Sequence, residues 1–415
     1  MPENLFEGFK ESTLNEWLDQ ARKELNGADP ASLNAELFPG FCFPPYLTSE
    51  SRNATQPSVS GGIREWIAAL ELYSPELENT MEMIAGEAGR ETSAACLFFT
   101  GNNTAAGNYK AAYGIEYRDQ ESLFRLFDAI NPLNRRFCFF GGADDFYPEK
   151  LLVAYAADRK LDPAGLSGFS QEKIFSIRQP NPGKETDGAF ANAATRFREA
   201  KQALPEFCPL MLPASIPEVV AAGPTMQLAA LLCMAAEYLR RWEKEDISPA
   251  DFFANAAVSF EAGNTFFVEV AKIRAFRKLW MSFQKTFGAN PVAAIVHSRP
   301  SLRLYSSTDP QSNILRATTA AISLVMGGAD IISLPPHDVL NSPQNHHSSR
   351  IAINIQHLLR HESLLGTVDD SASGSYYVEE LTQQIADQAL KIFQDAENAG
   401  GWISAMWNKK EGPMK

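Results

Sequence analysis

The 415-residue chain lacks the features that mark several large classes of protein. It has no block of Lys or Arg and a net charge of −13, which argues against nucleic acid and anionic membrane surfaces as main partners. No apolar run approaches the ~18 residues that a membrane span needs. The start of the chain is polar and acidic, without a signal core. We therefore expect a cytoplasmic protein with neither a membrane nor a nucleic-acid partner.

Cysteine and histidine are also scarce. The five cysteines are scattered and form no CxxC pair, so we expect them to be reduced and mostly buried. No histidine precedes His297. His346 and His347 are adjacent in a polar loop, and His357 and His361 lie one helical turn apart without the acid of an HExxH motif. A solvated loop and a helix surface explain these four residues better than a metal site does.

The chain does contain a regular alternation of apolar strands and amphipathic helices. Strands are expected at 94–99, 136–140, 207–212, 292–296 and 331–334, with others near 169–177 and within 251–260. Helices are expected at 63–74, 75–86, 121–130, 148–160, 188–204, 226–245, 265–287, 313–326, 349–362 and 381–400. This alternation predicts an α/β protein, a (β/α)8 TIM barrel with an N-terminal helical and extended arm. An open doubly wound sheet is less favoured, because no Gly-rich dinucleotide fingerprint follows the early strands.

The predicted domain organisation has three parts. Residues 1–60 form the arm, with a helix at 5–25 and a proline-punctuated aromatic stretch at 40–46. Residues 61–400 form the barrel, and 401–415 a polar tail or the start of a linker. An extended aromatic arm needs a surface to lie on. Packing on its own barrel and wrapping a partner subunit both satisfy that need, and the residues do not separate the two.

The segment 291–381 is the densest in polar residues set at the ends of apolar stretches. Ligand groups of a barrel sit on loops that follow the carboxyl ends of the strands. On such a loop, His297 with Arg299 could hold an anion or polarise a carbonyl; equally, His297 could only satisfy loop backbone groups. No nucleophile elbow or Walker loop is present. The residues alone predict a barrel with a small-molecule pocket.

Residues 266–275, His297-Ser298 and 374–382 resemble the barrel of the methylmalonyl-CoA mutase family, and the resemblance runs from about 217 to 400. It implies an N-terminal arm, a barrel threaded by the CoA chain and a separate cobalamin domain. Gln171 and His297 match family pocket residues, whereas Arg299 falls where active members have another polar group. We expect Gln171, His297 and Arg299 to bind substrate, a CoA thioester.

This sequence departs from the family pattern at the groups that carry the reaction. The catalytic His of active members aligns with Glu218, whose carboxylate cannot donate to a thioester oxygen unless protonated. A family Arg near a strand end aligns with Asn255, and the cobalt-binding Asp-x-His-x-x-Gly loop is missing. The resemblance thus implies a small (beta, non-catalytic) subunit without catalytic residues or a cofactor of its own.

Such a chain would pair as a heterodimer with a large subunit that carries adenosylcobalamin, or form a homodimer. Two other interpretations stay open: an active acyl-CoA mutase barrel that uses a cobalamin domain in trans, and a CoA-thioester-binding module without chemistry. A piece of a longer chain is also compatible with the sequence.

Overall fold

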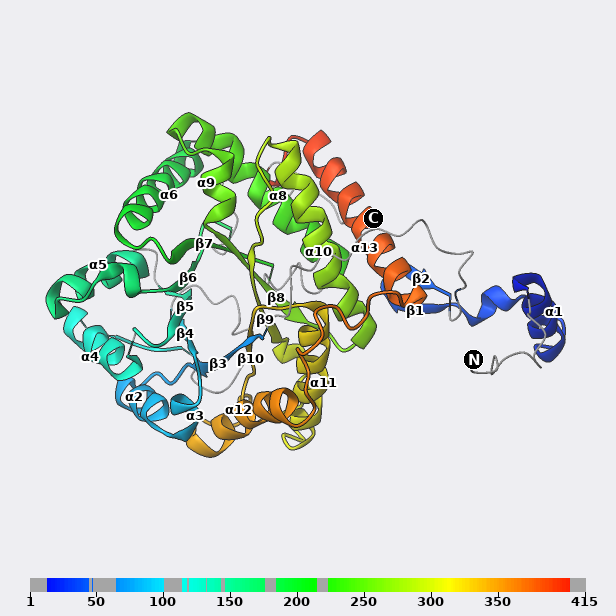
Figure 1. Ribbon diagram of the computed structural model, residues 1–415, viewed down its shortest axis with the longest axis horizontal. Helices are drawn as coiled ribbons and strands as arrows, with labels where there is room; N and C mark the ends of the chain where they lie inside the picture. The colour runs from blue at the N-terminus through cyan, green and yellow to red at the C-terminus, as the bar shows by residue number, and fades with distance from the viewer. Residues whose placement is uncertain are drawn as a thin grey trace, which may run out of the picture.

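The computed structural model describes residues 13–44, 47, 65–100, 114–117, 119–131, 133–142, 146–175, 184–214 and 223–403. Within them, parallel strands close into a barrel in the order β10-β3-β4-β5-β6-β7-β8-β9, which Figure 1 shows from one end. The strands are β3 (Ile67–Leu72), β4 (Ala94–Phe99), β5 (Arg136–Gly141), β6 (Gly168–Gln171), β7 (Phe207–Pro213), β8 (Ala256–Ala262), β9 (Ile295–Pro300) and β10 (Ile331–Ser333). The predicted (β/α)8 TIM barrel is therefore confirmed.

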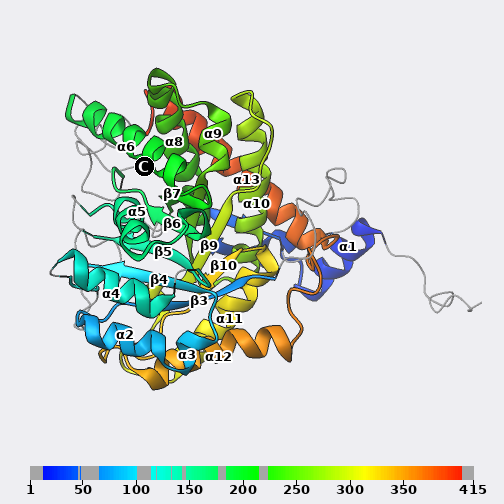
Figure 2. The same ribbon diagram turned by 60° about the vertical axis from the view of Figure 1, so that its left-hand side comes forward.

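Helices surround this barrel in Figures 1 and 2. They are α2 (Leu77–Ala85), α3 (Glu87–Arg90), α4 (Gln120–Ile130), α5 (Pro148–Arg159), α6 (Lys184–Ala203), α8 (Pro224–Trp242), α9 (Pro249–Ala254), α10 (Phe266–Thr286), α11 (Ser312–Gly327), α12 (His346–His361) and α13 (Tyr376–Asn398). Short 3-10 turns lie at η1 (Pro30–Leu33), η3 (Pro163–Gly165), η4 (Glu243–Glu245) and η5 (Leu302–Leu304). Each long α/β crossover turns the chain back so that all barrel strands point the same way.

The first barrel strand, β3, contradicts the sequence prediction, which placed a helix over residues 63–74. Its sequence is IAALEL, and Ala and Leu favour helices over strands. In the fold this segment pairs with β4 on one side and β10 on the other. It closes the barrel, and pairing on both edges overrides the local propensity.

Two later elements begin away from their predicted positions. The strand expected at 292–296 runs instead over Ile295–Pro300, so His297 and Arg299 lie within β9 and not on a loop after it. The last long helix starts at Tyr376 rather than residue 381, because the Ser375 side chain accepts a hydrogen bond from the backbone N–H of Val378 and caps it. Polar residues inside an apolar strand mislead a prediction based on hydropathy.

Gly168 illustrates how closely two strands approach. Its φ is +139°, and a Cβ atom built on it would lie 1.8 Å from the backbone oxygen of Phe137 on β5. Glycine fits this position because it has no Cβ atom to clash and adopts a positive φ without steric cost. Replacing Gly168 would therefore push β6 away from β5.

The long helix α13 lies against α10 and α8. Tyr377 contacts Phe267 near the start of α10, and Phe393 contacts Phe283 near its end, so α13 and α10 run in the same direction. Between these contacts, Arg274 of α10 forms ion pairs of 2.9 Å with both Asp370 and Glu379. A buried guanidinium with two carboxylate partners ties the segment before α13, and α13 itself, to the barrel wall.

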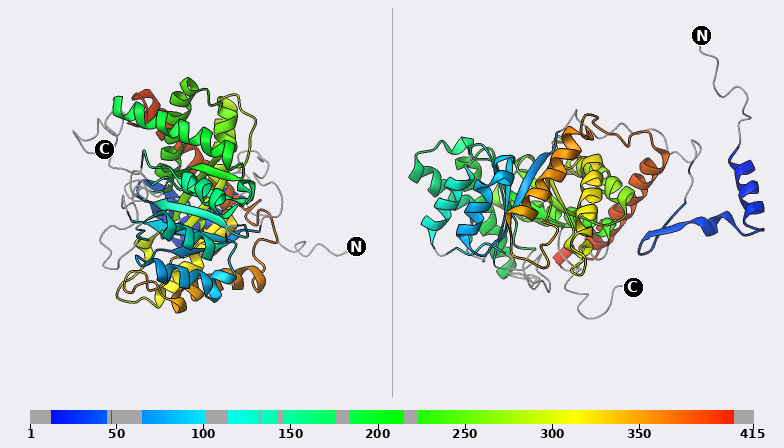
Figure 3. Two further views of the ribbon diagram at one scale, coloured as in Figure 1. Left: turned by 90° about the vertical axis from the view of Figure 1, so that its left-hand side faces the viewer. Right: turned by 90° about the horizontal axis from the view of Figure 1, so that it is seen from below.

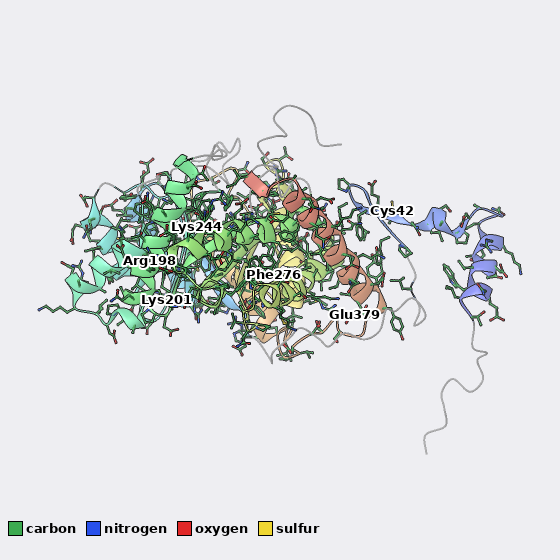
Figure 4. The ribbon with its side chains drawn as sticks, turned by 90° about the horizontal axis from the view of Figure 1, so that it is seen from above. Cys42, Arg198, Lys201, Lys244, Phe276 and Glu379 are labelled. Atoms are coloured by element: carbon green, nitrogen blue, oxygen red, sulfur yellow. The ribbon has the colours of Figure 1, made fainter. Side chains whose placement is uncertain are left out.

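The N-terminal arm consists of α1 (Leu14–Glu24), η1 and an antiparallel pair, β1 (Ala35–Phe38) and β2 (Phe41–Phe43). The strand pair is anchored to the barrel: Phe43 is buried and packs edge-on against Tyr377 at 5.0 Å between ring centroids. Cys42 of β2 is exposed, and Figure 4 shows it beside α13, at the opposite flank from Arg198 and Lys201. The expectation of buried cysteines holds for the other four.

The helix α1 is organised differently from the rest of the arm. Thr13 and Glu16 form a capping box, which stabilises its first turn without help from the barrel. No residue of α1 is buried. In Figures 1 and 3 this helix stands away from the barrel, at the far end of the arm. No helix within the described ranges is long and apolar enough to cross a membrane.

Candidate ligand site inside the barrel

Two of the candidates, His297 and Arg299, point into the interior of the barrel. They are two residues apart on β9, so their side chains lie on the same face of the strand. His297 has no exposed surface and Arg299 is 3% exposed. The expected ligand groups therefore belong to the packed interior and not to a rim.

Both ring nitrogens of His297 have partners within the chain. Its Nδ1 lies 2.9 Å from the hydroxyl of Ser259 on β8, and its Nε2 lies 3.0 Å from the hydroxyl of Ser333 on β10. The thiol of Cys96 lies 3.8 Å from the same Nε2. The histidine thus bonds to the strands on either side of β9, and no nitrogen is left for a ligand in this arrangement.

The hydrogen bonds also define the tautomer of His297. The Ser333 hydroxyl donates its single hydrogen to the Glu71 carboxylate at 2.9 Å, so it accepts from Nε2–H of His297. Nδ1 is then an acceptor for Ser259. Burial, together with the positive charge of Arg299, lowers the pKa of His297 to about 3. At neutral pH the ring is uncharged and supplies no cation for an anionic ligand.

Arg299 is held by a carboxylate from the opposite end of the sequence. Its Nε lies 3.0 Å from Oε1 of Glu71, and its Nη2 donates to Oε2 at 3.1 Å. Glu71 is 1% exposed, and burial raises its pKa, opposed by the charge of Arg299 and the hydrogen bond from Ser333. One charge-assisted hydrogen bond and a second close approach between opposite charges hold the two buried side chains together.

Aromatic rings fill the space around this polar cluster. The guanidinium carbon of Arg299 lies 4.8 Å from the centre of the Phe98 ring, and Phe98 stacks on Phe140 at 4.7 Å. Phe140 and Phe169 lie 5.0 and 5.8 Å from the imidazole of His297. Because these rings come from β4, β5 and β6 while the histidine comes from β9, they meet across the interior. This layer is packed as in an ordinary barrel core.

Gln171 and Asn255 lie in different surroundings. Gln171 ends β6, two residues after Phe169, and its side-chain oxygen accepts from the backbone N–H of Gly141 at 3.2 Å. Asn255 caps α9 through a 2.8 Å bond to the Asp251 carbonyl and precedes β8, so it sits at the amino end of that strand. The expected position of Asn255 near a strand's carboxyl end is wrong. Glu218 lies outside the described residues.

A hollow does exist among the described residues, but away from His297. It lies beside the amino end of β10 and is lined by Gly328, by Trp66 and by residues of the segment 366–370. Its two arginines are each paired within the chain, Arg274 as described above and Arg277 with Asp330 at 3.0 Å. Within the same ranges, no group of three His, Cys, Asp or Glu residues is arranged to hold a metal ion.

Sequence reasoning missed the residues that complete the interior cluster. These are Glu71, Cys96, Ser259 and Ser333. A signal was available: Glu71 is a lone carboxylate in the apolar run IAALEL, and a buried charge needs an opposite charge nearby. Because the run was predicted as a helix, Glu71 was not recognised as a buried charge.

The geometry defines a class of protein: a (β/α)8 barrel whose interior is filled by its own side chains and which carries an N-terminal arm. A family model described as methylmalonyl-CoA mutase matches residues 123–411, more than half of the chain. The chain belongs to the methylmalonyl-CoA mutase family.

Several relatives are named as small subunits of that enzyme. The chain is 33% identical over 212 residues to the methylmalonyl-CoA mutase small subunit of Porphyromonas gingivalis, a match that covers 50% of this chain and 34% of the relative. It is 34% identical over 205 residues to the small subunit of Propionibacterium freudenreichii subsp. shermanii, covering 49% and 32%. A methylmalonyl-CoA mutase of Rhizobium meliloti is 33% identical over 190 residues, covering 45% and 27%. The matches span about a third of these relatives.

Proposed function

We propose that this chain is a catalytically inactive, small-subunit-like protein that pairs with a large cobalamin-binding subunit in methylmalonyl-CoA/succinyl-CoA isomerisation. One observation carries the proposal: two of the side chains expected to hold substrate, His297 and Arg299, are both engaged by buried partners in the chain. A thioester entering the barrel would have to displace the Glu71 carboxylate and the surrounding rings. That displacement leaves a buried charge without its partner, which is strongly unfavourable.

The distribution of histidines supports the loss of chemistry. No histidine precedes His297 in the sequence, and the position aligned with the family's catalytic His is Glu218. His297 is neutral at physiological pH, with Nε2–H already donated to Ser333. An electrophilic catalyst must place a donor at the oxygen where charge develops. Adenosylcobalamin is accordingly expected on the partner subunit.

The arm supports pairing. Leu14, Leu18, Ala21 and Leu25 follow helical spacing on one face of α1 and its C-cap and are only half-buried. An isolated helix of this length is only marginally stable in water. An apolar stripe that the barrel does not cover therefore favours packing of α1 against a second chain. A heterodimer with the large subunit is the proposed arrangement, and a homodimer is the other one that the stripe allows.

The proposal is tested by co-expression with a large mutase subunit from the same host. We expect the two chains to co-purify, and Leu18→Glu to reduce the recovered partner at least tenfold. Asn15→Glu is the matched control, because it adds the same charge to the same helix at an exposed position. A partner that is retained equally by both variants would contradict pairing through α1, and no co-purification at all would contradict the partner role.

Activity and ligand measurements test the inactive barrel. We expect the chain alone, supplied with adenosylcobalamin and methylmalonyl-CoA, to give no succinyl-CoA. Calorimetric titration with CoA and short acyl-CoAs is expected to show no heat of binding. Turnover with a separate cobalamin domain would support an active barrel instead, and binding without turnover would support a CoA-binding module. A cytoplasmic location is part of the proposal and is supported by five cysteines that are all free.

A further inference from the structure

The Glu71–Arg299 pair joins two strands that are not neighbours. Glu71 comes from β3 and Arg299 from β9, and between them lies β10, the three-residue strand that carries Ser333. Arg299 approaches both carboxylate oxygens, and Ser333 donates to one of them. A guanidinium and a hydroxyl from two strands therefore converge on one carboxylate. This is the usual composition of a site that recognises a carboxylic acid.

The surroundings of this carboxylate fit a ligand seat. The Phe98 ring backs the guanidinium of Arg299, which keeps its donors directed at Glu71. Both side chains are buried, at 4% and 0% exposure, so water does not compete for the contacts. A further acid, Glu261 on β8, stands beside Arg299 in the sheet register, and its negative charge raises the pKa of Glu71.

We propose that Arg299 and Ser333 form a carboxylate seat inside the barrel, and that Glu71 occupies this seat as a built-in ligand. The inference deepens the proposed loss of catalysis, because it names the intrachain group that keeps carboxyl-bearing compounds out. The chemical class that the seat takes is a short-chain carboxylate. Glu71→Ala removes one methylene and the carboxylate, which together match acetate in carbon and oxygen atoms, so acetate fits the vacated space.

The test compares thermal unfolding of wild type, Glu71→Ala and Glu71→Ala/Arg299→Met in sodium acetate and in sodium chloride at equal ionic strength. We expect acetate to raise the Tm of Glu71→Ala saturably, by about 3 °C or more, as a ligand that binds the folded state does. Wild type, whose seat is filled, and the double variant, which has no guanidinium, are expected not to respond beyond the chloride baseline.

An equal acetate response in all three proteins, or none in Glu71→Ala, would overturn the seat. If Glu71→Ala does not fold, Glu71→Gln replaces it, in a cycle with Arg299→Met. The double variant Glu71→Gln/Arg299→Met is then expected to have a higher Tm than Arg299→Met alone, because it leaves no unpaired buried charge. A double variant that is no more stable contradicts the counter-ion role. These outcomes are independent of co-purification, so a failed seat leaves the partner proposal standing.

Discussion

The barrel interior and the arm helix α1 differ in how far their side chains find partners within the chain. Inside the barrel, Glu71, Arg299 and His297 bind one another through Ser333 and Ser259. On α1, no residue is buried, although an apolar stripe runs along the helix. The charged groups of the interior are paired within the chain, whereas the apolar stripe of α1 is only half-buried by the described residues. The proposed loss of ligand binding and the proposed pairing with a partner therefore rest on different parts of one protein.

The largest effect is expected from breaking the interior pair. Arg299→Met leaves the Glu71 carboxylate buried without a cation and should lower the free energy of unfolding by about 3–5 kcal/mol. Urea denaturation measures this change. Arg125→Met removes an exposed arginine of α4 and should change stability by less than about 0.5 kcal/mol. A small decrease in the free energy of unfolding of Arg299→Met would contradict the pairing of Glu71 with Arg299 as a buried ion pair.

The anchored part of the arm is expected to show the next largest effect. Phe43→Ala removes a buried ring from the contact with Tyr377 and should weaken docking of the strand pair by about 3 kcal/mol. Because opening is local, proteolytic cleavage within residues 35–43 should speed up roughly a hundredfold while unfolding of the barrel stays unchanged. Cys42→Ala, at an exposed neighbour, is the control. Barrel unfolding that shifts with Phe43→Ala would show that arm and barrel are one cooperative unit.

The neutral histidine makes stability depend on pH. Since the pKa of His297 is about 3 in the folded chain against an ordinary 6.5, protonation favours the unfolded state. The contribution of the neutral His297 ring to the free energy of unfolding is complete above pH 6.5 and is lost as the pH falls toward 3. About 2 kcal/mol of it is lost between pH 6.5 and pH 5. The free energy of unfolding of wild type minus that of His297→Gln should therefore decline across this window. A constant difference would contradict the buried neutral ring.

The smallest effect on stability is expected on α1. Leu18→Glu should change the free energy of unfolding of the isolated chain by less than about 0.5 kcal/mol, because Leu18 is only half-buried and α1 has no fully buried residue. Thermal unfolding with Asn15→Glu as reference measures this. A marked fall in Tm for Leu18→Glu alone would show that α1 packs on its own barrel, and would remove the contrast between the two regions.

Much of the architecture could be predicted from local sequence. The strands at 94–99 and 136–140 are continuous apolar runs that end in small polar residues or glycine, and the structure has them there. β3 could not be predicted in the same way, because its Ala and Leu residues favour a helix until β4 and β10 pair with it. His297 was predicted as a candidate by its type, but its position within β9 and its neutral state depend on neighbours remote in sequence.

By itself, the sequence determined the alternation of strands and helices, the capped amphipathic α1 and the absence of any histidine before His297. These are properties of residues close together in the chain or of composition. Tertiary structure alone decided that Glu71 meets Arg299, 228 positions away. The physical reason is barrel closure: β10 pairs with β3, which brings the first strand beside the last two and completes a charge pair that no local pattern contains.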